Sequence, residues 1–297
     1  MDYESLGGWV HDPAEVGKVL TTMDRPLFSQ AAPHLSGSGT DKTVLLYKAF
    51  KDVNGDYIPY TAQQIGDCVS MGWGHGTDLL ECVQIAIGKK AETLKQTATE
   101  AVYGMARVDI GGGGMRGDGA VGAWAAKAVS TLGTVDRDVV GPYSGQRARE
   151  WGRSGVPAAI KSQAGAHKVK TVSLVSTYEE LEDALANGYP VPVCSNQGFA
   201  LTRDANGFCR PRGVWGHCML IVGTRTDIPG ACVFQSWGMD SPTGPLALDQ
   251  PPNSFWADRQ TVADMLAMQD SFSMSNFDGY PGQPLPDHWT LTDAIAL

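Results

Sequence analysis

Apolar residues between positions 68 and 88 recur at the spacing that lines one face of a helix. The positions that share this face are Met71, Trp73, Leu79, Leu80, Val83 and Ile87. Gly88 stands where such a helix would end, and a Gly-Asp-Cys turn comes directly before it. The pattern therefore predicts a helix whose first turn carries Cys68.

The chain changes its pattern near its middle. The first half favours helices over residues 12–23, 90–108 and 120–132, in addition to the one that begins at Cys68. The second half has short apolar or β-branched runs bounded by glycine and proline, which indicate antiparallel strands. These strands are predicted at residues 169–175, 191–194, 216–225 and 231–237, with helices at residues 177–187 and 258–268. A helical half packed against an antiparallel β half, with a cleft between them, is an α+β fold.

We divide the chain into three parts on this basis. Residues 1–56 form an N-terminal arm, residues 57–245 the main domain, and residues 246–297 a Pro/Gly-rich C-terminal extension packed on it. Within the main domain, residues 57–165 are the helical half and residues 166–245 the β half. The arm is an accessory segment, a docking segment or an inhibitory strap, and its pattern does not choose among these roles.

Composition excludes several classes of function. An apolar content of 42% supplies a large core, and a net charge of −9 without a Lys/Arg block argues against nucleic-acid binding. The N-terminus has acidic residues where a secretory signal has basic ones, and no stretch reaches the length needed to span a bilayer. We expect a cytoplasmic protein, in a host cytoplasm or a virion if phage-encoded, with a polypeptide substrate or a protein partner. The oligomeric state stays open.

The cysteines point to chemistry rather than to cross-links. In a cytoplasm the six cysteines are expected to be reduced, and they contain no C-x-x-C pair that would indicate structural zinc. We expect neither a metal nor a cofactor. Cys68 at a helix N-terminus is favoured as a thiolate by the helix dipole and the free N–H groups. The alternative is a small buried apolar residue.

A cysteine nucleophile needs a base, a group that orients the base, and donors for an oxyanion. His217 begins an apolar strand, and Gln235 lies in the next strand, where its side-chain carbonyl would accept the imidazole N–H. Gln63, or alternatively Gln64, precedes the cysteine closely enough to donate its amide to the oxyanion together with the Cys68 N–H. These residues form the candidate catalytic set.

In these motifs the chain resembles the papain-like, cathepsin-type cysteine peptidases. Gln63 with Gly66-Asp67-Cys68 matches that family's Gln…Gly-Ser-Cys, and Gly216-His217-Cys218-Met219 matches its His-Ala-Val. Gln235-Ser236-Trp237-Gly238 matches its Asn-Ser-Trp-Gly. The spacing from nucleophile to base is 217 − 68 = 149 residues, in line with about 130–150 in the family. The resemblance covers roughly residues 57–245 and is of the divergent, unsecreted kind seen in bacteria and phages.

The resemblance implies a thiol peptidase or related amide hydrolase. Cys68 would attack, His217 would carry the proton, Gln235 would orient His217, and Gln63 would stabilise the oxyanion. It also implies that the glycine loop at Gly117 and Gly119 lines the substrate backbone and that Trp237 shields the His217–Gln235 bond.

Further residues near these motifs have less specific expectations. Asn196, and equally Ser195, would face the cleft. His75 is expected to be packed or on the surface, and Cys218 is expected in the core, because neighbours on a strand point to opposite faces.

The sequence departs from the family's pattern at several positions. Val69 follows the cysteine where the family usually has an aromatic residue, and Gln63 is one residue closer to Cys68 than usual. Gln235 stands in place of asparagine and is one methylene longer, and Asp67 places a negative charge beside the nucleophile. Two other functions therefore stay open. One is a papain-like scaffold with little or no activity that serves in binding or assembly, for instance in a phage particle. The other is an amidase acting on cell-wall peptides.

Overall fold

The computed structural model describes residues 6–89 and 92–292. Its helices are α1 (Pro13–Leu20), α2 (Phe28–Ala31), η2 (Pro33–Leu35), α3 (Lys48–Asn54), α4 (Cys68–Gly88), α5 (Thr99–Gly104), the π-helix η3 (Met105–Ile110), α6 (Gly122–Thr131), α7 (Arg137–Val140), α8 (Gly145–Ser154), α9 (Ala158–Ala164), α10 (Tyr178–Ala186), α11 (Arg259–Leu266) and η4 (Asp287–Trp289). Its strands are β1 (Lys42–Val44), β2 (Thr171–Leu174), β3 (Val191–Phe199), β4 (Pro211–Arg225), β5 (Gly230–Phe234), β6 (Ser254–Asp258), β7 (Phe272–Ser275) and β8 (Thr290–Thr292).

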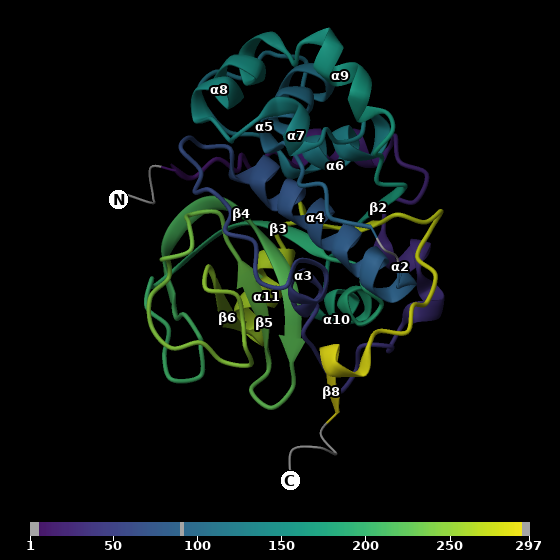
Figure 1. Ribbon diagram of the computed structural model, residues 1–297, viewed down its shortest axis with the longest axis vertical. Coiled ribbons are helices and arrows are strands. Elements are labelled where there is room, and N and C mark those ends of the chain that lie inside the picture. The colour runs from purple at the N-terminus through teal and green to yellow at the C-terminus, as the bar shows by residue number, and fades with distance from the viewer. Residues whose placement is uncertain (1–5, 90–91, 293–297) are drawn as a thin grey trace.

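These elements form two lobes. Figure 1 shows the helices α5 to α9 together in one lobe and the strands β3 to β6 in the other, with α4 crossing between them. The predicted α+β class, with a helical half followed by an antiparallel β half, is confirmed.

The main sheet is antiparallel and centred on β4. Its strand order is β6-β5-β4-β1-β8, and β3 also pairs with β4, from Ile221 to Pro211. A second sheet consists of β2 and β7. The strand predicted at residues 216–225 begins earlier, at Pro211, because the hairpin with β3 continues beyond His217. In the register of this hairpin, Ser195 lies opposite His217, and Cys194 lies opposite Cys218.

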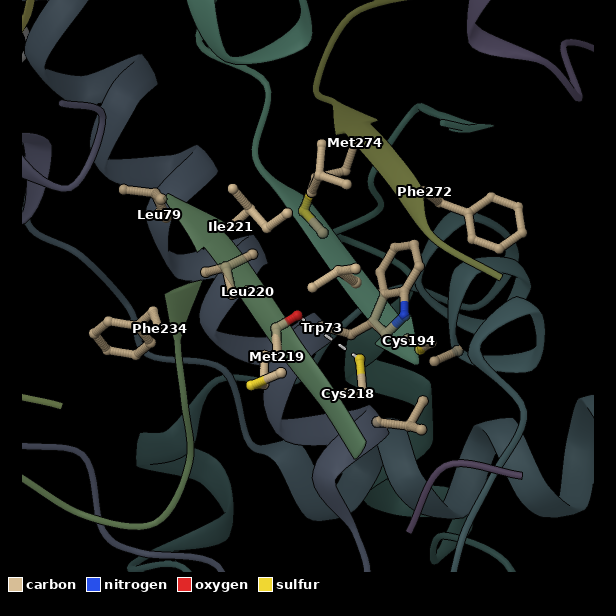
Figure 2. Close-up of a cluster of buried hydrophobic side chains, with 14 of the residues drawn as sticks. Trp73, Leu79, Cys194, Cys218, Met219, Leu220, Ile221, Phe234, Phe272 and Met274 are labelled. Atoms are coloured by element: carbon tan, nitrogen blue, oxygen red, sulfur yellow. Dashed lines mark hydrogen bonds between the residues drawn. The ribbon is translucent and has the colours of Figure 1, made fainter. Parts of the chain in front are cut away.

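The core lies between α4 and the strands. Figure 2 shows side chains of α4, β3, β4 and β7 meeting there, including Trp73, Leu220 and Met274. Two glycines of α4 allow the close approach: a Cβ added at Gly72 would lie 2.9 Å from Cys218 Sγ, and one at Gly76 would lie 2.8 Å from Met274 Cε. The helix therefore rests almost directly on the sheet, which fixes the position of its first turn.

The segments at the two ends of the chain meet at the edge of the main sheet. β1 pairs with β8 through three successive residue pairs and with β4 through Val44 and Thr224. β6 continues the same sheet beyond β5. The arm and the C-terminal extension thus contribute strands to the sheet, and the boundaries proposed between them and the main domain stay predictions.

The helix predicted for residues 90–108 begins later than its pattern indicated. Its first two residues lie outside the described residues, and α5 starts only at Thr99. The reason is a tertiary contact: the Ala98 N–H donates to the Val135 carbonyl at 2.7 Å, which keeps the preceding chain out of a helix. Intrinsic helix propensity yields to such pairing because it is worth less than 1 kcal/mol for ordinary residues.

A buried arginine organises the glycine-rich loop that follows η3. Arg107 is 2% exposed, and its guanidinium donates to the carbonyls of Met115, Gly117, Gly119 and Gly152 and to the Tyr103 hydroxyl. The planar fork satisfies acceptors on several sides at once, which an ammonium cannot do. The loop is therefore held in shape by one side chain from inside.

We predict that Arg107→Lys lowers the free energy of unfolding by about 2–4 kcal/mol, because several charge-assisted bonds to buried carbonyls are lost. Urea denaturation measures this, with Arg153→Lys on the exposed end of α8 as the matched control. Equal stability of Arg107→Lys and the unmodified protein would contradict this role.

Candidate active site

Cys68 is the first residue of α4, and its sulfur lies against the sheet. The N–H of Cys218 donates to Cys68 Sγ at 3.4 Å, so the helix N-terminus and β4 meet at the thiol. Cys68 has no exposed surface. The predicted position of the cysteine at the start of a helix that ends at Gly88 is confirmed.

His217 neighbours this contact on β4 and lies under an aromatic ring. Its imidazole stacks on Trp237, with ring centroids 4.6 Å apart and an interplanar angle of 25°. His217 is fully buried, and burial lowers its pKa to about 3. Among the described residues, neither Nδ1 nor Nε2 has a hydrogen-bond partner. Trp237 therefore positions the ring through its face, while both nitrogens are left unused.

Gln235 does not form the expected bond to His217. Its Oε1 accepts the N–H of Trp237 at 2.5 Å, and its Nε2 donates to the Ser241 carbonyl. The additional methylene allows the amide to fold back onto its own loop, which satisfies both of its polar atoms. The predicted Gln235–His217 bond is absent from this structure.

The Gln63 side-chain amide donates to two peptide carbonyls, one of them from the N-terminal segment. Gln63 Oε1 accepts from the Ser236 hydroxyl, while Nε2 donates to the Ile65 carbonyl at 2.8 Å and to the Leu6 carbonyl at 2.9 Å. Gln64 is used elsewhere, because its Oε1 accepts the Gly145 N–H at 2.9 Å. Of the two glutamines, it is Gln63 that contacts the segment containing Leu6.

That segment is residues 6–10, which we call the covering segment. The Trp9 N–H donates to the Gly216 carbonyl at 2.9 Å, just before His217. Gly8 packs so tightly that an added Cβ would overlap the Gly66 carbonyl. The segment therefore lies across the turn that leads to Cys68, between the two lobes.

The covering segment also pairs with the glycine-rich loop. The Ala120 N–H donates to the Gly8 carbonyl at 2.8 Å, and the Val10 N–H donates to the Ala120 carbonyl at 3.0 Å. Gly119 has a positive φ of 114°, and a Cβ there would lie 2.9 Å from the Gly8 oxygen, so this close approach requires glycine. Nothing lies within 4 Å of a Cβ added at Gly117, whose carbonyl is bound by Arg107 instead.

Three backbone groups of this site were missed by the sequence reasoning. They belong to Gly66, Ala120 and Gly216, and each contacts the covering segment through main-chain atoms. Every residue has main-chain groups, so the residue type does not identify the ones that bind. The only indication in the sequence is the glycines among and beside these residues. Asn196, expected in the cleft, is exposed at an irregularity of β3 and takes part in none of these contacts, whereas Ser195 is buried.

Burial controls the charge state of Cys68. It raises the pKa of the Cys68 thiol, a nearby Cys218 adds to the rise, and the backbone N–H groups of Cys218 and Gly8 oppose it. Asp67 is also fully buried, and burial raises its pKa to about 8 although the Tyr143 hydroxyl donates to it at 2.9 Å. The thiolate expected from the helix terminus is therefore not the favoured form under the covering segment, because desolvation outweighs the helix dipole.

The two remaining candidates, His75 and Cys218, are packed in the interior of the protein. His75 packs on the Tyr60 ring with centroids 3.9 Å apart, and burial lowers its pKa to about 3. Cys218 belongs to the buried cluster of Figure 2, as predicted.

Within residues 6–89 and 92–292, no group of three or more metal-binding side chains comes together. No helix in the same part of the chain has the length and apolar character to cross a membrane.

Solved structures show which fold this arrangement belongs to. The cysteine protease xylellain from Xylella fastidiosa superposes with a TM-score of 0.63 at 16% identity, covering 92% of this chain and 96% of that one. A procathepsin B from Trypanosoma congolense gives 0.57 at 11% identity, with 95% and 87% covered. A digestive procathepsin L2 from the larval midgut of Tenebrio molitor gives 0.56 at 14%, with 93% and 80% covered.

The chain has a papain-like fold. The predicted resemblance is confirmed at this level by structure alone, since no family model matches the sequence and no curated protein matches it. Within the papain-like fold, Cys68 begins α4 and contacts β4 at Cys218, the residue that follows His217.

We predict that the stability advantage of Asp67→Asn over the unmodified protein grows as the pH rises. A carboxyl with a pKa near 8 in the folded chain keeps a proton that the unfolded chain has released, so folding becomes less favourable between about pH 4 and about pH 8. Asparagine stays neutral and keeps an acceptor for Tyr143. Urea denaturation at about pH 5 and about pH 8 should show the difference growing by at least about 1.4 kcal/mol.

The matched control is Asp264→Asn on the exposed face of α11. The prediction fails if Asp67→Asn and the unmodified protein differ in free energy of unfolding by the same amount at both pH values. The Asp67 carboxyl is then not held protonated.

Proposed function

We propose that this protein is a cysteine peptidase held in a latent state by its own covering segment. The observation that carries the proposal is that the site already binds a peptide segment through its backbone groups. A peptide carbonyl, that of Leu6, lies on the Gln63 amide, and the Trp9 N–H is bound by the Gly216 carbonyl. A cleft that holds a peptide backbone beside a cysteine and a histidine has the groups that peptide hydrolysis needs.

The proposed reaction uses Cys68 as the nucleophile and His217 as the base. The sulfur attacks the substrate carbonyl carbon as its proton passes to His217, and the oxyanion is stabilised by Gln63 Nε2 and the Cys68 N–H. Collapse of this intermediate breaks the C–N bond, with His217 giving its proton to the leaving amine. Water, deprotonated by His217, then releases the acyl group and restores the thiol.

Latency follows from competition for the same groups. The Gln63 amide, the Ala120 N–H and the Gly216 carbonyl are all occupied by the covering segment. A substrate backbone can use them only after the segment leaves. Its departure also readmits water to Cys68 and His217, which removes the desolvation that now favours the neutral thiol and imidazole.

One observation favours a second candidate function, a papain-like scaffold without activity that serves in binding or assembly. The Gln235 amide is satisfied by Trp237 and Ser241 and leaves the His217 nitrogens without a partner. An unoriented imidazole is a poorer base, because its partner normally fixes the tautomer. Measurement of hydrolysis in a protein whose site has been opened separates the two functions.

We predict that Gly8→Ala raises the rate of peptide hydrolysis at least about tenfold, because the methyl group collides with the Gly66 backbone and lifts the covering segment. The assay uses a mixture of internally quenched fluorogenic peptides. Gly17→Ala in α1 is the matched control, since a Cβ there meets nothing within 4 Å.

Two further variants assign the activity to the site. Cys68→Ala and His217→Ala, each combined with Gly8→Ala, should return hydrolysis to the level of the buffer. If Gly8→Ala hydrolyses no peptide while Cys68 becomes accessible to alkylation, the peptidase proposal is wrong and the scaffold function is favoured.

A further inference from the structure

Two buried cysteines face each other across the hairpin of β3 and β4, close to Cys68. Cys194 lies directly opposite Cys218 in the register, and both are free thiols with at most 1% of their surface exposed. Residues directly opposite each other in an antiparallel pair point to the same face of the sheet. That face is the one that α4 covers, because a Cβ added at Gly72 would lie 2.9 Å from Cys218 Sγ. Figure 2 shows both side chains in the cluster between helix and sheet.

The two cysteines form a non-hydrogen-bonded pair of the ladder. The Cys194 N–H donates to Ser271 Oγ at 3.2 Å. The Cys218 N–H donates to Cys68 Sγ at 3.4 Å, so neither N–H is used between the two strands. Pro192, two residues before Cys194 on β3, occupies a pair of the same kind and has no N–H to exchange. The Cα atoms of such a pair are about 4.5 Å apart, within the range of about 4.4–6.8 Å that a disulfide spans. A disulfide between Cys194 and Cys218 is therefore compatible with the hairpin.

Cys68 lies on the other side of Cys218 from Cys194. The N–H groups of a non-hydrogen-bonded pair point away from the partner strand, so the sulfur that accepts the Cys218 N–H lies on the side remote from β3. Cys68 and Gly72 also share one face of α4, and Gly72 is where Cys218 Sγ packs on the helix. Thiol–disulfide exchange moves a bond from one sulfur to the next through a central one. Here Cys218 holds the central place.

The three thiols differ in how an oxidant would reach them. Cys68 lies under the covering segment, which leaves in the proposed function, whereas Cys194 and Cys218 lie between α4 and the sheet. Burial raises the pKa of the Cys194 thiol, and a hydrogen bond with the Cys218 thiol adds to the rise. Oxidation of a cysteine follows its thiolate character and its exposure. In the opened protein an oxidant therefore meets Cys68 first.

We propose that Cys218 and Cys194 are a resolving dithiol that returns Cys68 to a thiol after oxidation by a hydroperoxide. With hydrogen peroxide, the Cys68 thiolate attacks one oxygen and the O–O bond breaks. Cys68 becomes a sulfenic acid, and the hydroxide that leaves takes up the proton that Cys68 lost. The Cys218 sulfur then attacks Cys68 Sγ, so that an S–S bond forms, the S–O bond breaks, and water leaves with the Cys218 proton. Finally Cys194 attacks Cys218 Sγ, and Cys68 leaves and takes up the proton of Cys194.

The sum of these steps is the reduction of hydrogen peroxide to water and the oxidation of two thiols to one disulfide. Cys68 is thereby kept from the sulfinic acid, which thiols do not reduce. A thiol reductant converts the Cys194–Cys218 disulfide back to the dithiol. The inference rests on the proposed peptidase function in needing a reactive Cys68, and it adds a second chemical activity at that residue.

A purely structural role of the two cysteines makes a different prediction. If Cys194 and Cys218 only fill space as small apolar residues, peroxide drives Cys68 to the sulfinic acid and leaves both of them as thiols. The discriminating observation is therefore the state of each of the three cysteines after oxidation.

The test treats the full chain carrying Gly8→Ala with an equimolar amount of hydrogen peroxide, alkylates the remaining thiols and locates them by mass spectrometry. We expect a Cys194–Cys218 disulfide, with loss of alkylation at both positions, while Cys68 stays open to alkylation. Adding Cys194→Ala should stop the reaction at a Cys68–Cys218 disulfide, and adding Cys218→Ala should leave Cys68 as sulfenic and sulfinic acid. The matched control is Cys82→Ala, at another buried cysteine of α4, which should leave the Cys194–Cys218 disulfide unchanged.

Conversion of Cys68 to the sulfinic acid while Cys194 and Cys218 stay alkylated would overturn the inference, and this comparison uses a protein that keeps all three cysteines. A Cys194–Cys218 disulfide that still forms when Cys68→Ala is added would overturn it too, because the oxidant then reaches the pair directly. So would the absence of any oxidation in Gly8→Ala, since the first step takes place at Cys68. Hydrolysis without the disulfide contradicts the resolving dithiol alone, and the disulfide without hydrolysis contradicts the peptidase function alone.

Discussion

The contact between α4 and β4 sets the geometry on which the rest of the site depends. Gly72 and Gly76 remove the side chains that would hold the helix off the sheet, so the first turn of α4 comes down on the backbone of Cys218. The N-terminus of α4 and the strand β4 thereby place the thiol of Cys68 against the residue that follows His217. Widening this contact by one methyl group at Gly72 would press on Cys218 Sγ and displace the sulfur of Cys68 from the strand.

The second constraint is the competition between desolvation and the helix dipole at Cys68. A helix N-terminus contributes about 0.3–1 kcal/mol toward an anion at an exposed site, whereas burial shifts a pKa by up to about 3–5 units. At Cys68 the effect of desolvation on the pKa is larger than that of the helix N-terminus, and Asp67 places a buried carboxyl next to the thiol. In the proposed peptidase, the segment that blocks the substrate also keeps the Cys68 thiol neutral, so one displacement would relieve both effects.

Local patterns and short motifs were sufficient to predict the elements that carry Cys68 and His217. The helix that begins at Cys68 follows from its apolar spacing and its glycine stop, and the strand that carries His217 follows from its β-branched run. The stacking of Trp237 on His217 agrees with the resemblance to papain-like enzymes. The start of α5 was not predictable in this way, because it depends on the bond between Ala98 and Val135, which are far apart in the sequence.

The missed features are all of this long-range or backbone kind. The direction of the Gln235 amide is set by Ser241 and by the N–H of Trp237, and the alternative acceptors are not visible in a motif. The position of residues 6–10 depends on main-chain groups of Gly66, Ala120 and Gly216, which any sequence possesses. The pairing of Cys194 with Cys218 was missed because it depends on the register between β3 and β4.

The most direct test of the account is the pH dependence of Cys68 alkylation by iodoacetamide, with labelling located by mass spectrometry, in the intact protein and in Gly8→Ala. The account predicts slow labelling of the intact protein from about pH 5 to about pH 9, and in Gly8→Ala fast labelling well below the ordinary thiol pKa of about 8.5. The fast labelling should disappear when His217→Ala is added. Slow labelling of Gly8→Ala with the profile of an ordinary thiol would contradict the central claim that a reactive Cys68–His217 pair lies beneath the covering segment.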